Sequence, residues 1–308
     1  MLFIFFVLLI PVFCNAKIRI HIHAASSLEY SSVRSSGIDL KTVTDREIAL
    51  FNLTKDNLIR GIRIELGRYP EDVFLTDPTP YENLFEKFKW PPVRRKLTIE
   101  AVKIIDIINE PVQVTVQEFI NNTTKPIKRN IGIYKTVEST VFSTWSKTGF
   151  PVDNITYGIK VSYRNSNKTF EYENLWRSTL VRNQMVRFGA SKPGYVKVEP
   201  GQKLRTTLNG FKTIVLVEVT YKASVIGNVI GDFEELEGIH YHFFAPTVRN
   251  IMKAADIYNE LITTEEVEVR CFTDPRVEVS IEHADVEIVT ARNRAFVSLG
   301  GKRQRNKK

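Results

Sequence analysis

The strongest constraint on the fold comes from residues 131–163, where apolar and polar side chains alternate. In the second half of this stretch every other residue is apolar: Ile155, Tyr157, Ile159, Val161 and Tyr163. A period of two residues is that of a β-strand with one apolar and one polar face, and a helix with its 3.6-residue period would not preserve it. The stretch therefore predicts strands that each bury one face.

The first half of the stretch carries a weaker apolar face, made by Val137, Val141 and Trp145 with serines between them. The intervening residues 149–154 include Pro151, and proline and Asx residues favour turns. The pattern predicts one long β-hairpin over residues 131–163. Its apolar side chains are Val137, Val141, Trp145, Ile155, Tyr157, Ile159, Val161 and Tyr163.

Residues 1–16 form an uncharged apolar run that ends at Ala16, with Lys17 directly after it. A membrane-spanning helix needs roughly 20 apolar residues, so this run predicts a cleaved signal peptide and a secreted, extracellular protein. Removal of the signal also removes Cys14 and leaves Cys271 alone, which excludes an intrachain disulfide. We expect Cys271 to be a buried, inert thiol, and a link between two chains is the alternative.

The formal net charge of +8 is concentrated at the C-terminus. The last seven residues contain five cations, Lys302, Arg303, Arg305, Lys307 and Lys308. The remainder is only mildly basic, which argues against a nucleic-acid partner. We expect residues 281–308 to form a last strand and a disordered basic tail. The tail is also a candidate processing site at Lys302, Arg303 and Arg305, or a contact for anionic lipid headgroups.

The order of the patterns predicts two domains: a mixed α/β domain over residues 17–111 and an antiparallel β body over residues 112–280. In the first domain, Thr44 and Glu47 form a capping box before an apolar helix face. A second helix is predicted to begin with Thr79 as its N-cap and to end before Pro91. The fold class is mainly β, and α+β overall.

The strand-like part of the chain after Arg95 contains three predicted turns and one further helix. The turns are marked by residues 109–111, by Pro200 with Gly201, and by Asp274 with Pro275, because proline, glycine and Asx residues suit turn geometry. The further helix is predicted over residues 247–255, just after Pro246.

Residues that could carry catalysis are few. The histidine pairs His21 with His23, and His240 with His242, each place two rings on one strand face, but two ligands do not close a zinc site. The sequence contains no nucleophile elbow, phosphate-binding loop, dinucleotide fingerprint or HExxH motif. We therefore predict no enzyme activity, no metal and no cofactor.

Sequons for N-glycosylation occur at five positions, which is more than chance placement suggests: Asn52, Asn121, Asn122, Asn154 and Asn167. In a secreted chain some of these asparagines are expected to carry glycans, and the neighbours Asn121 and Asn122 are not expected to do so together.

The segments INEPVQVTVQEFINNTTKP, VEPGQK and VTYKASVIGNV follow one another around the amphipathic stretch. In this order the chain resembles the aerolysin-like β proteins over residues 112–280. With DVFLTDPTPYENLFEKFKW and GIHYHFFAP it is similar to the spherulins and insect follicular-epithelium yolk proteins of that superfamily. The resemblance implies an elongated, secreted, non-enzymatic β protein, and in the toxin branch a hairpin that detaches to form an oligomeric transmembrane barrel.

Three functions are compatible with these observations. The first is structural or storage protein of the spherulin and yolk-protein kind, deposited in an egg or resting stage. It is favoured by the sequon at Asn154 beside the predicted hairpin turn and by Ser139 and Ser143 on the face that would meet lipid.

The second function is an oligomerising β-barrel pore-former, activated by cleavage in the basic tail. The candidate membrane-facing side chains of its hairpin are the apolar ones: Val137, Val141, Trp145, Ile155, Tyr157, Ile159, Val161 and Tyr163. Residues 155–164 suffice for a tilted strand that crosses a bilayer in about 9 to 11 residues. The third is a carbohydrate- or lipid-binding module that uses the aromatic residues Tyr81, Phe85, Phe88 and Trp90. The partners expected are further copies of the chain and a membrane lipid or glycan receptor.

Overall fold

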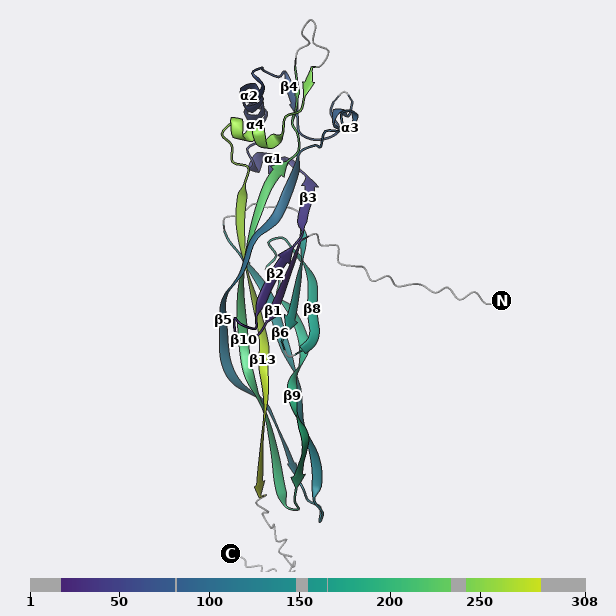
Figure 1. Ribbon diagram of the computed structural model, residues 1–308, viewed down its shortest axis with the longest axis vertical. Coiled ribbons are helices and arrows are strands. Elements are labelled where there is room, and N and C mark those ends of the chain that lie inside the picture. The colour runs from purple at the N-terminus through teal and green to yellow at the C-terminus, as the bar shows by residue number, and fades with distance from the viewer. Residues whose placement is uncertain (1–17, 81, 148–154, 165, 234–241, 284–308) are drawn as a thin grey trace, which may run out of the picture.

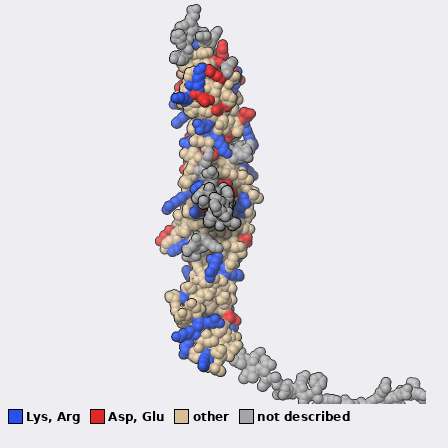
Figure 2. Space-filling model, turned by 90° about the vertical axis from the view of Figure 1, so that its right-hand side faces the viewer, with Lys and Arg blue, Asp and Glu red and all other residues tan. Residues whose placement is uncertain are grey.

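The computed structural model describes residues 18–80, 82–147, 155–164, 166–233 and 242–283. The molecule is narrow and long: its helices gather at one end, the head, and long strands run from there to the opposite, lower end (Figure 1). The predicted elongated, mainly β architecture with antiparallel sheets is confirmed. Lys and Arg side chains gather at the lower end, whereas both charge signs mix at the head (Figure 2).

The largest sheet has six antiparallel strands in the order β3-β5-β10-β13-β6-β9. These strands are β3 (Ile38–Thr42), β5 (Arg94–Ile120), β6 (Ile127–Trp145), β9 (Arg182–Val198), β10 (Gln202–Ile226) and β13 (Leu261–His283). β5, β10 and β13 are the three longest strands of this sheet, and we call them the spine. Along β10 buried and half-buried residues alternate, as expected for a strand with one face on a core.

A second sheet of four strands has the order β2-β1-β7-β8. Its strands are β1 (Arg19–Ala24), β2 (Ser32–Ser36), β7 (Thr156–Tyr163) and β8 (Ser166–Leu175). β1 and β7 are parallel, and the other neighbours are antiparallel. One hydrophobic core joins the sheets, because Ile20 and Ile159 of the small sheet share a buried cluster with Val217 and Val267 of the spine.

The head contains the third sheet and the helices. The sheet has the order β12-β11-β4, made of β4 (Asp72–Phe74), β11 (Ile230–Asp232) and β12 (Phe243–Phe244). The helices are α1 (Asp45–Leu50), α2 (Lys55–Leu66), α3 (Leu84–Lys87) and α4 (Val248–Ala254).

The helix caps test the local predictions in the head. α1 begins with the predicted capping box of Thr44 and Glu47, and α4 begins after Thr247 within the predicted range. The predicted start of α3 is wrong, because its N-cap is Asn83 rather than Thr79. Thr79 lies outside the helix, and its hydroxyl accepts a hydrogen bond of 3.2 Å from the backbone N–H of Leu84.

Two of the three predicted turns are wrong. β5 runs without a break through residues 109–111, and Pro111 is tolerated because β3 pairs only with residues 94–98 of this strand. β13 likewise continues through Asp274 and Pro275, where a register shift and a φ of 51° at Asp274 mark a β-bulge. The turn at Gly201, with a φ of 75°, is confirmed between β9 and β10.

The predicted division at residues 111–112 falls inside β5, so one strand belongs to both predicted domains. The head is joined to the top of the spine by a buried ion-pair cluster. The Arg95 guanidinium lies 2.6 Å from the Asp39 carboxylate and 2.8 Å from that of Glu47, and all three side chains are buried. Because these side chains are shielded from water, loss of one of them would leave a buried charge without compensation and would destabilise the fold.

Candidate functional site

The predicted hairpin over residues 131–163 is wrong in its pairing. Its first half is β6, which pairs with β13 and β9 in the six-stranded sheet, and its second half is β7, which pairs with β1 and β8 in the other sheet. The alternating pattern decides which side chains are buried, but it carries no information about the partner strand. The hairpin that contains β7 is made with β8, and we call it the β7–β8 hairpin.

The β7–β8 hairpin is amphipathic on both arms. Its inner face carries Ile159 opposite Tyr172 and Val161 opposite Phe170. On its outer face the Lys160 ammonium lies 3.6 Å from the Glu171 carboxylate across the two strands. The apolar face therefore lies on the spine, and the charged face lies on the surface.

The residues predicted to face a membrane are all packed in the interior. Seven are buried, and the eighth, Trp145, is half-buried with its indole N–H donating to the carbonyl of Ser178. Those on β6 are Val137, Val141 and Trp145, and those on β7 or directly before it are Ile155, Tyr157, Ile159, Val161 and Tyr163. In this conformation the apolar stretch is a core face.

A buried carboxylic group lies between the hairpin and the spine. Glu265 of β13 is fully buried and accepts a hydrogen bond of 2.6 Å from the Tyr221 hydroxyl and another from the Tyr157 hydroxyl. Asn174 of β8 donates its side-chain N–H to the Tyr157 oxygen at 2.8 Å. The chain of contacts thus runs from β13 and β10 across the interface to both arms of the hairpin.

Four aromatic rings surround this polar network. Trp176 packs with its ring centroid 4.7 Å from those of both Trp145 and Tyr221, and Tyr157 meets the same rings edge-on. We call Glu265, Asn174 and these four aromatic residues the seam. Burial raises the pKa of Glu265, and burial together with the adjacent carboxylate raises the pKa of the Tyr157 and Tyr221 hydroxyls.

Sequence reasoning missed Glu265, although one signal marks it. Along β13 the residue shares its parity with Val267, Val269 and Cys271, which are buried, so an acidic residue stands on the apolar face of a strand. Cys271 is itself buried, as predicted, and burial raises the pKa of its thiol to about 12. A thiol held protonated in this way is a poor nucleophile.

The predicted glycosylation sites differ in their exposure to solvent. Asn121 is fully buried, and its side-chain N–H group donates to the carbonyls of Lys125 and Val198, so a glycan on that nitrogen would remove both bonds. Asn52 and Asn122 are exposed. Asn154 and the side chain of Asn167 lie outside the described part of the chain.

Among the described residues, the remaining predicted sites do not form a metal centre. His21 and His23 both approach the Ser162 hydroxyl, at 3.3 and 2.9 Å, and no group of metal-ligating side chains occurs among the described residues. His240 and the tail residues Lys302, Arg303 and Arg305 fall in parts of the chain that the structure does not describe.

The aromatic residues of the predicted binding module belong to the core of the head. Phe85 is buried, and the half-buried Phe88 and Trp90 stack on each other with their centroids 4.7 Å apart. Tyr81 lies outside the description. The exposed aromatic surface that a binding module would need is therefore not formed by Phe85, Phe88 and Trp90.

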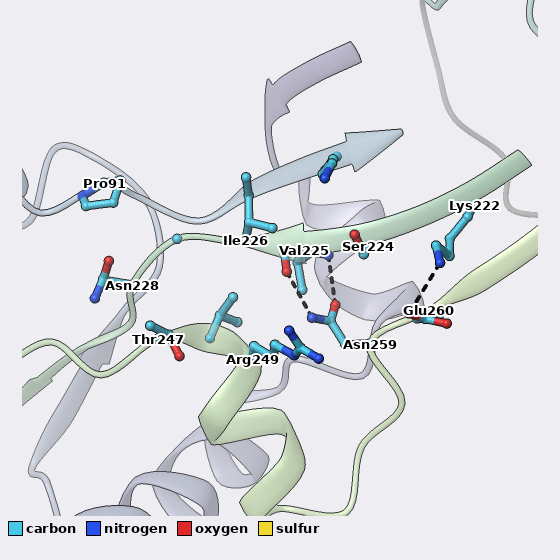
Figure 3. Close-up of a pocket in the computed structure, with 13 residues that line it drawn as sticks. Pro91, Lys222, Ser224, Val225, Ile226, Asn228, Thr247, Arg249, Asn259 and Glu260 are labelled. Carbon is cyan, nitrogen blue, oxygen red and sulfur yellow. Dashed lines mark hydrogen bonds and ion pairs between the residues drawn. The ribbon is translucent and has the colours of Figure 1, made fainter. Parts of the chain in front are cut away.

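A cavity of about 580 Å³ lies where β10 and β13 meet the head (Figure 3). Asn259 bonds the backbone N–H and carbonyl of Val225 at 2.8 and 2.9 Å, and Lys222 lies 3.7 Å from Glu260 (Figure 3). These side chains tie the segment after α4 to the end of β10.

No protein-family model matches the chain. It is 25% identical over 260 residues to U-megalopygitoxin(8)-Mo12 of Megalopyge opercularis, covering 83% of this chain and 89% of the relative. It is 24% identical over 261 residues to U-megalopygitoxin(8)-Mc8 of Megalopyge crispata, covering 84% and 90%. A crystal structure of parasporin-2, a Bacillus thuringiensis toxin that recognises cancer cells, has 12% identity and a TM-score of 0.47 over 80% of this chain and 99% of that one.

Across the described residues, no helix has both the length and the apolar composition needed to cross a membrane. The relatives that match most of the chain carry the names of toxins. Those names favour the predicted toxin function over the predicted storage function.

Proposed function

We propose that the protein is a secreted, non-enzymatic, pore-forming toxin, and that its β7–β8 hairpin leaves the spine to insert into a membrane. The observation that carries the proposal is the hairpin itself. It is amphipathic on both arms, and it is held to the spine by side-chain packing, in a different sheet from the spine strands. The toxin names of relatives that span most of the chain support the same function.

The dimensions of the hairpin suit insertion. β7 has 8 residues and β8 has 10, close to the roughly 9 to 11 residues of a tilted membrane-crossing strand. Once released, Ile159, Val161 and Phe170 would face lipid, while Lys160 and Glu171 would face a water-filled lumen. Two strands alone would expose unpaired backbone edges to hydrocarbon, so several copies of the chain are needed to close a barrel.

The position of the β7–β8 hairpin in the sequence determines which glycosylation site would obstruct insertion. Its tip lies between Tyr163 and Ser166, so the sequon at Asn154 does not adjoin the turn in the sequence. The sequon nearest the tip is Asn167. A glycan at Asn167 would have to cross the bilayer with the tip, at a cost of several kcal/mol for each unsatisfied polar group. The proposal therefore requires unmodified Asn167 and tolerates a glycan at Asn154.

A disulfide between β1 and β7 tests whether the hairpin must leave. His23 and Ser162 are opposite each other on these two strands and lie on the outer face, so the double variant His23→Cys, Ser162→Cys disturbs little of the core. Neighbouring strands are about 4.8 Å apart, within the range that a disulfide spans. The oxidised protein is expected to release no dye from liposomes of animal-cell lipids, and reduction is expected to restore release.

The two single-cysteine variants are the controls, and they are expected to release dye in either redox state. Protein with and without mild trypsin treatment is compared, because the basic tail is a candidate processing site. Equal leakage from the oxidised and reduced double variant would show that β7 does not leave β1. Absence of leakage from the unaltered protein, with liposomes and with dye-loaded cells alike, would rule out the pore function itself.

A further inference from the structure

At the lower end of the molecule, β6 and β9 present two lysines and an exposed aromatic ring side by side. In the strand register Lys128 of β6 stands directly opposite Lys197 of β9, and two residues along, Asn130 stands opposite Tyr195. Side chains opposite each other on paired strands point to the same side of the sheet, and so do those two residues apart on one strand. All four residues are exposed, Tyr195 to 71%. We call Lys128, Lys197 and Tyr195 the cationic face.

The two lysines of the cationic face are not neutralised. Lys197 lies 2.6 Å from the carboxylate of Glu199, and both side chains of this pair are exposed, to 62% and 43%. Lys128 has no ion-pair partner among the described residues. Like charges directly opposite each other on neighbouring strands weaken the pairing of the strands. The fold therefore keeps two cations side by side although only one of them has an acidic partner.

Further cations surround the cationic face, in agreement with the Lys and Arg side chains that gather at this end (Figure 2). Lys125 lies in the connection between β5 and β6, and Lys192 lies on β9. Both are exposed, and neither has an ion-pair partner in the described part of the chain. On β10, Lys203 and Arg205 share the carboxylate of Glu118, at 3.0 and 3.9 Å. Positive charge thus exceeds negative charge around the face.

The acidic residues nearest the end of β13 belong to a different pair of strands. Glu278 and Glu282 stand on the last part of β13, which pairs with β10 and not with β6 or β9. Arg129 does not belong to the face either, because its guanidinium lies 3.9 Å from the centroid of the Phe119 ring of β5. The cationic face therefore consists of side chains that the fold leaves accessible to a partner.

A β-bulge precedes the exposed ring of Tyr195. Asn130 and Ile131 are adjacent on β6, but two extra residues, Pro193 and Gly194, separate their partners on β9. Gly194 has a φ of 98°, which favours glycine. Bulges bend a strand and redirect its side chains. An aromatic ring directly after the bulge is thus held in solvent on the same side as the two lysines.

We propose that the cationic face binds the surface of an anionic lipid bilayer. Lys128 and Lys197 would lie at the phosphate groups, and Tyr195 would lie at the boundary between headgroups and acyl chains. Anionic membrane surfaces attract clustered basic residues, and tyrosine is enriched at membrane–water interfaces because its ring is apolar and its hydroxyl is polar. A soluble polyanion would pair with the lysines but would leave the exposed ring of Tyr195 without an apolar partner.

The tip of the β7–β8 hairpin points toward the same end. Tyr157, at the start of β7, bonds Glu265 of β13, and Arg164, next to the tip, lines a cavity with Asp274 further along β13. From there β13 continues to its end at the lower end of the molecule (Figure 1). A molecule bound through the cationic face would direct the hairpin tip at the bilayer. This consequence rests on the proposed pore function, whereas the binding itself does not.

Flotation with vesicles of phosphatidylcholine, with and without phosphatidylglycerol, tests the face. Binding is expected only with the anionic lipid, and it is expected to weaken at high salt, which screens exposed charges. Lys128→Ala and Lys197→Ala are each expected to weaken binding about fivefold, the contribution of one basic side chain near an anionic surface. The matched control is Lys253→Ala, which removes an exposed cation of α4 in the head and is expected to bind normally.

A second variant, Tyr195→Trp, shows whether this face itself meets lipid. It keeps an aromatic residue that suits the interface, so it is expected to bind anionic vesicles as well as the unaltered protein. The added fluorescence is expected to shift to shorter wavelength on binding and to be quenched by brominated acyl chains. The unaltered protein, measured in the same way, gives the background from its own tryptophans.

The proposal is overturned if the protein does not float with anionic vesicles, or if Lys128→Ala and Lys197→Ala float as well as the unaltered protein. The second result would assign the attraction to another cationic part of the chain. Flotation without a change in the fluorescence of Tyr195→Trp would also overturn it.

Two further outcomes separate the lipid from other partners and from the pore. Retention on a heparin column that requires Lys128 and Lys197, without flotation, would overturn the lipid partner in favour of a sulfated glycan. Vesicle binding without dye release would support the cationic face and count against the pore function. Dye release that is the same in Lys128→Ala and Lys197→Ala would support the pore function and count against the face.

Discussion

The spine and the β7–β8 hairpin bury similar side chains, but they are held by different interactions. β10 is hydrogen-bonded along one edge to β13 from Gln202 to Ala223, and along the other to β5 as far as Ile226. The hairpin meets the spine through side chains, and its own ladder is short. Release of the hairpin breaks the side-chain packing and only the short β1–β7 ladder of six residue pairs, whereas separation of the spine strands would break ladders along most of their length. This difference is the reason for proposing that the hairpin, rather than the spine, moves.

The interiors of the two regions differ as well. Part of the shared core is aliphatic and includes the buried residues Val217, Val219 and Ile20. The seam instead contains a carboxylic group with two tyrosine hydroxyls. A buried polar network is often no more stable than apolar residues of the same volume, but removal of one member is costly. The seam therefore holds the hairpin specifically in place without making the interface as strong as the aliphatic core.

The largest expected effect concerns the buried ion pairs of Arg95, which join the head to the spine. Arg95→Met leaves the buried carboxylates of Asp39 and Glu47 without their cation, which is expected to lower the free energy of unfolding by about 3 to 5 kcal/mol. Urea denaturation monitored by circular dichroism measures the change. The control is Lys103→Met on the same strand, whose ion pair with Glu218 is exposed and is worth about 0.2 to 1 kcal/mol. Equal losses in both variants would contradict the anchoring role of Arg95.

A matched pair of valines compares the two regions directly. Val161 in the hairpin and Val217 in the spine are both fully buried, so Val161→Ala and Val217→Ala each lose about 2 kcal/mol of packing free energy. Hydrogen exchange measured by mass spectrometry is expected to show faster exchange of residues 156–175 alone in Val161→Ala. In Val217→Ala the protection of the whole body is expected to fall. If both variants changed the same amides, the hairpin would not open as a separate unit.

The smallest expected effect is the pH dependence of the seam. The folded protein raises the pKa of Glu265 above its ordinary 4.5 through burial, so the folded state binds this proton more tightly than the unfolded state. The contribution of Glu265 to stability is therefore full below pH 4.5 and is lost as the pH rises through the raised pKa. In Glu265→Gln this decline is expected to be absent.

Urea midpoints measured between roughly pH 4 and pH 8 test the sign, as the difference between the unaltered protein and Glu265→Gln. Subtraction removes the contributions of other carboxylates, and Tyr157 and Tyr221 do not interfere because their pKa values are raised from 10.0. A difference that grows with pH in favour of the unaltered protein would contradict the burial argument. The seam would then be stabilised by the ionised carboxylate.

Two local features were predicted correctly because a few neighbouring residues decide the backbone there. The capping box at Thr44 and the turn at Gly201 depend on hydrogen bonds and φ angles within four residues. Asp274 and Pro275 were misinterpreted because the same residues suit a tight turn and a β-bulge equally well. Only the continuing partner strand β10 makes that site a bulge.

The sequence by itself determined which side chains of residues 155–163 lie inside, because the alternation of apolar and polar residues is a local property of the strand. It could not determine that β7 pairs with β1 and β8 rather than with β6, since many strands with the same period are compatible partners. That choice was made by the tertiary structure. The folded chain places Glu265 of β13 against Tyr157 of β7, and this contact between residues distant in the sequence creates the seam.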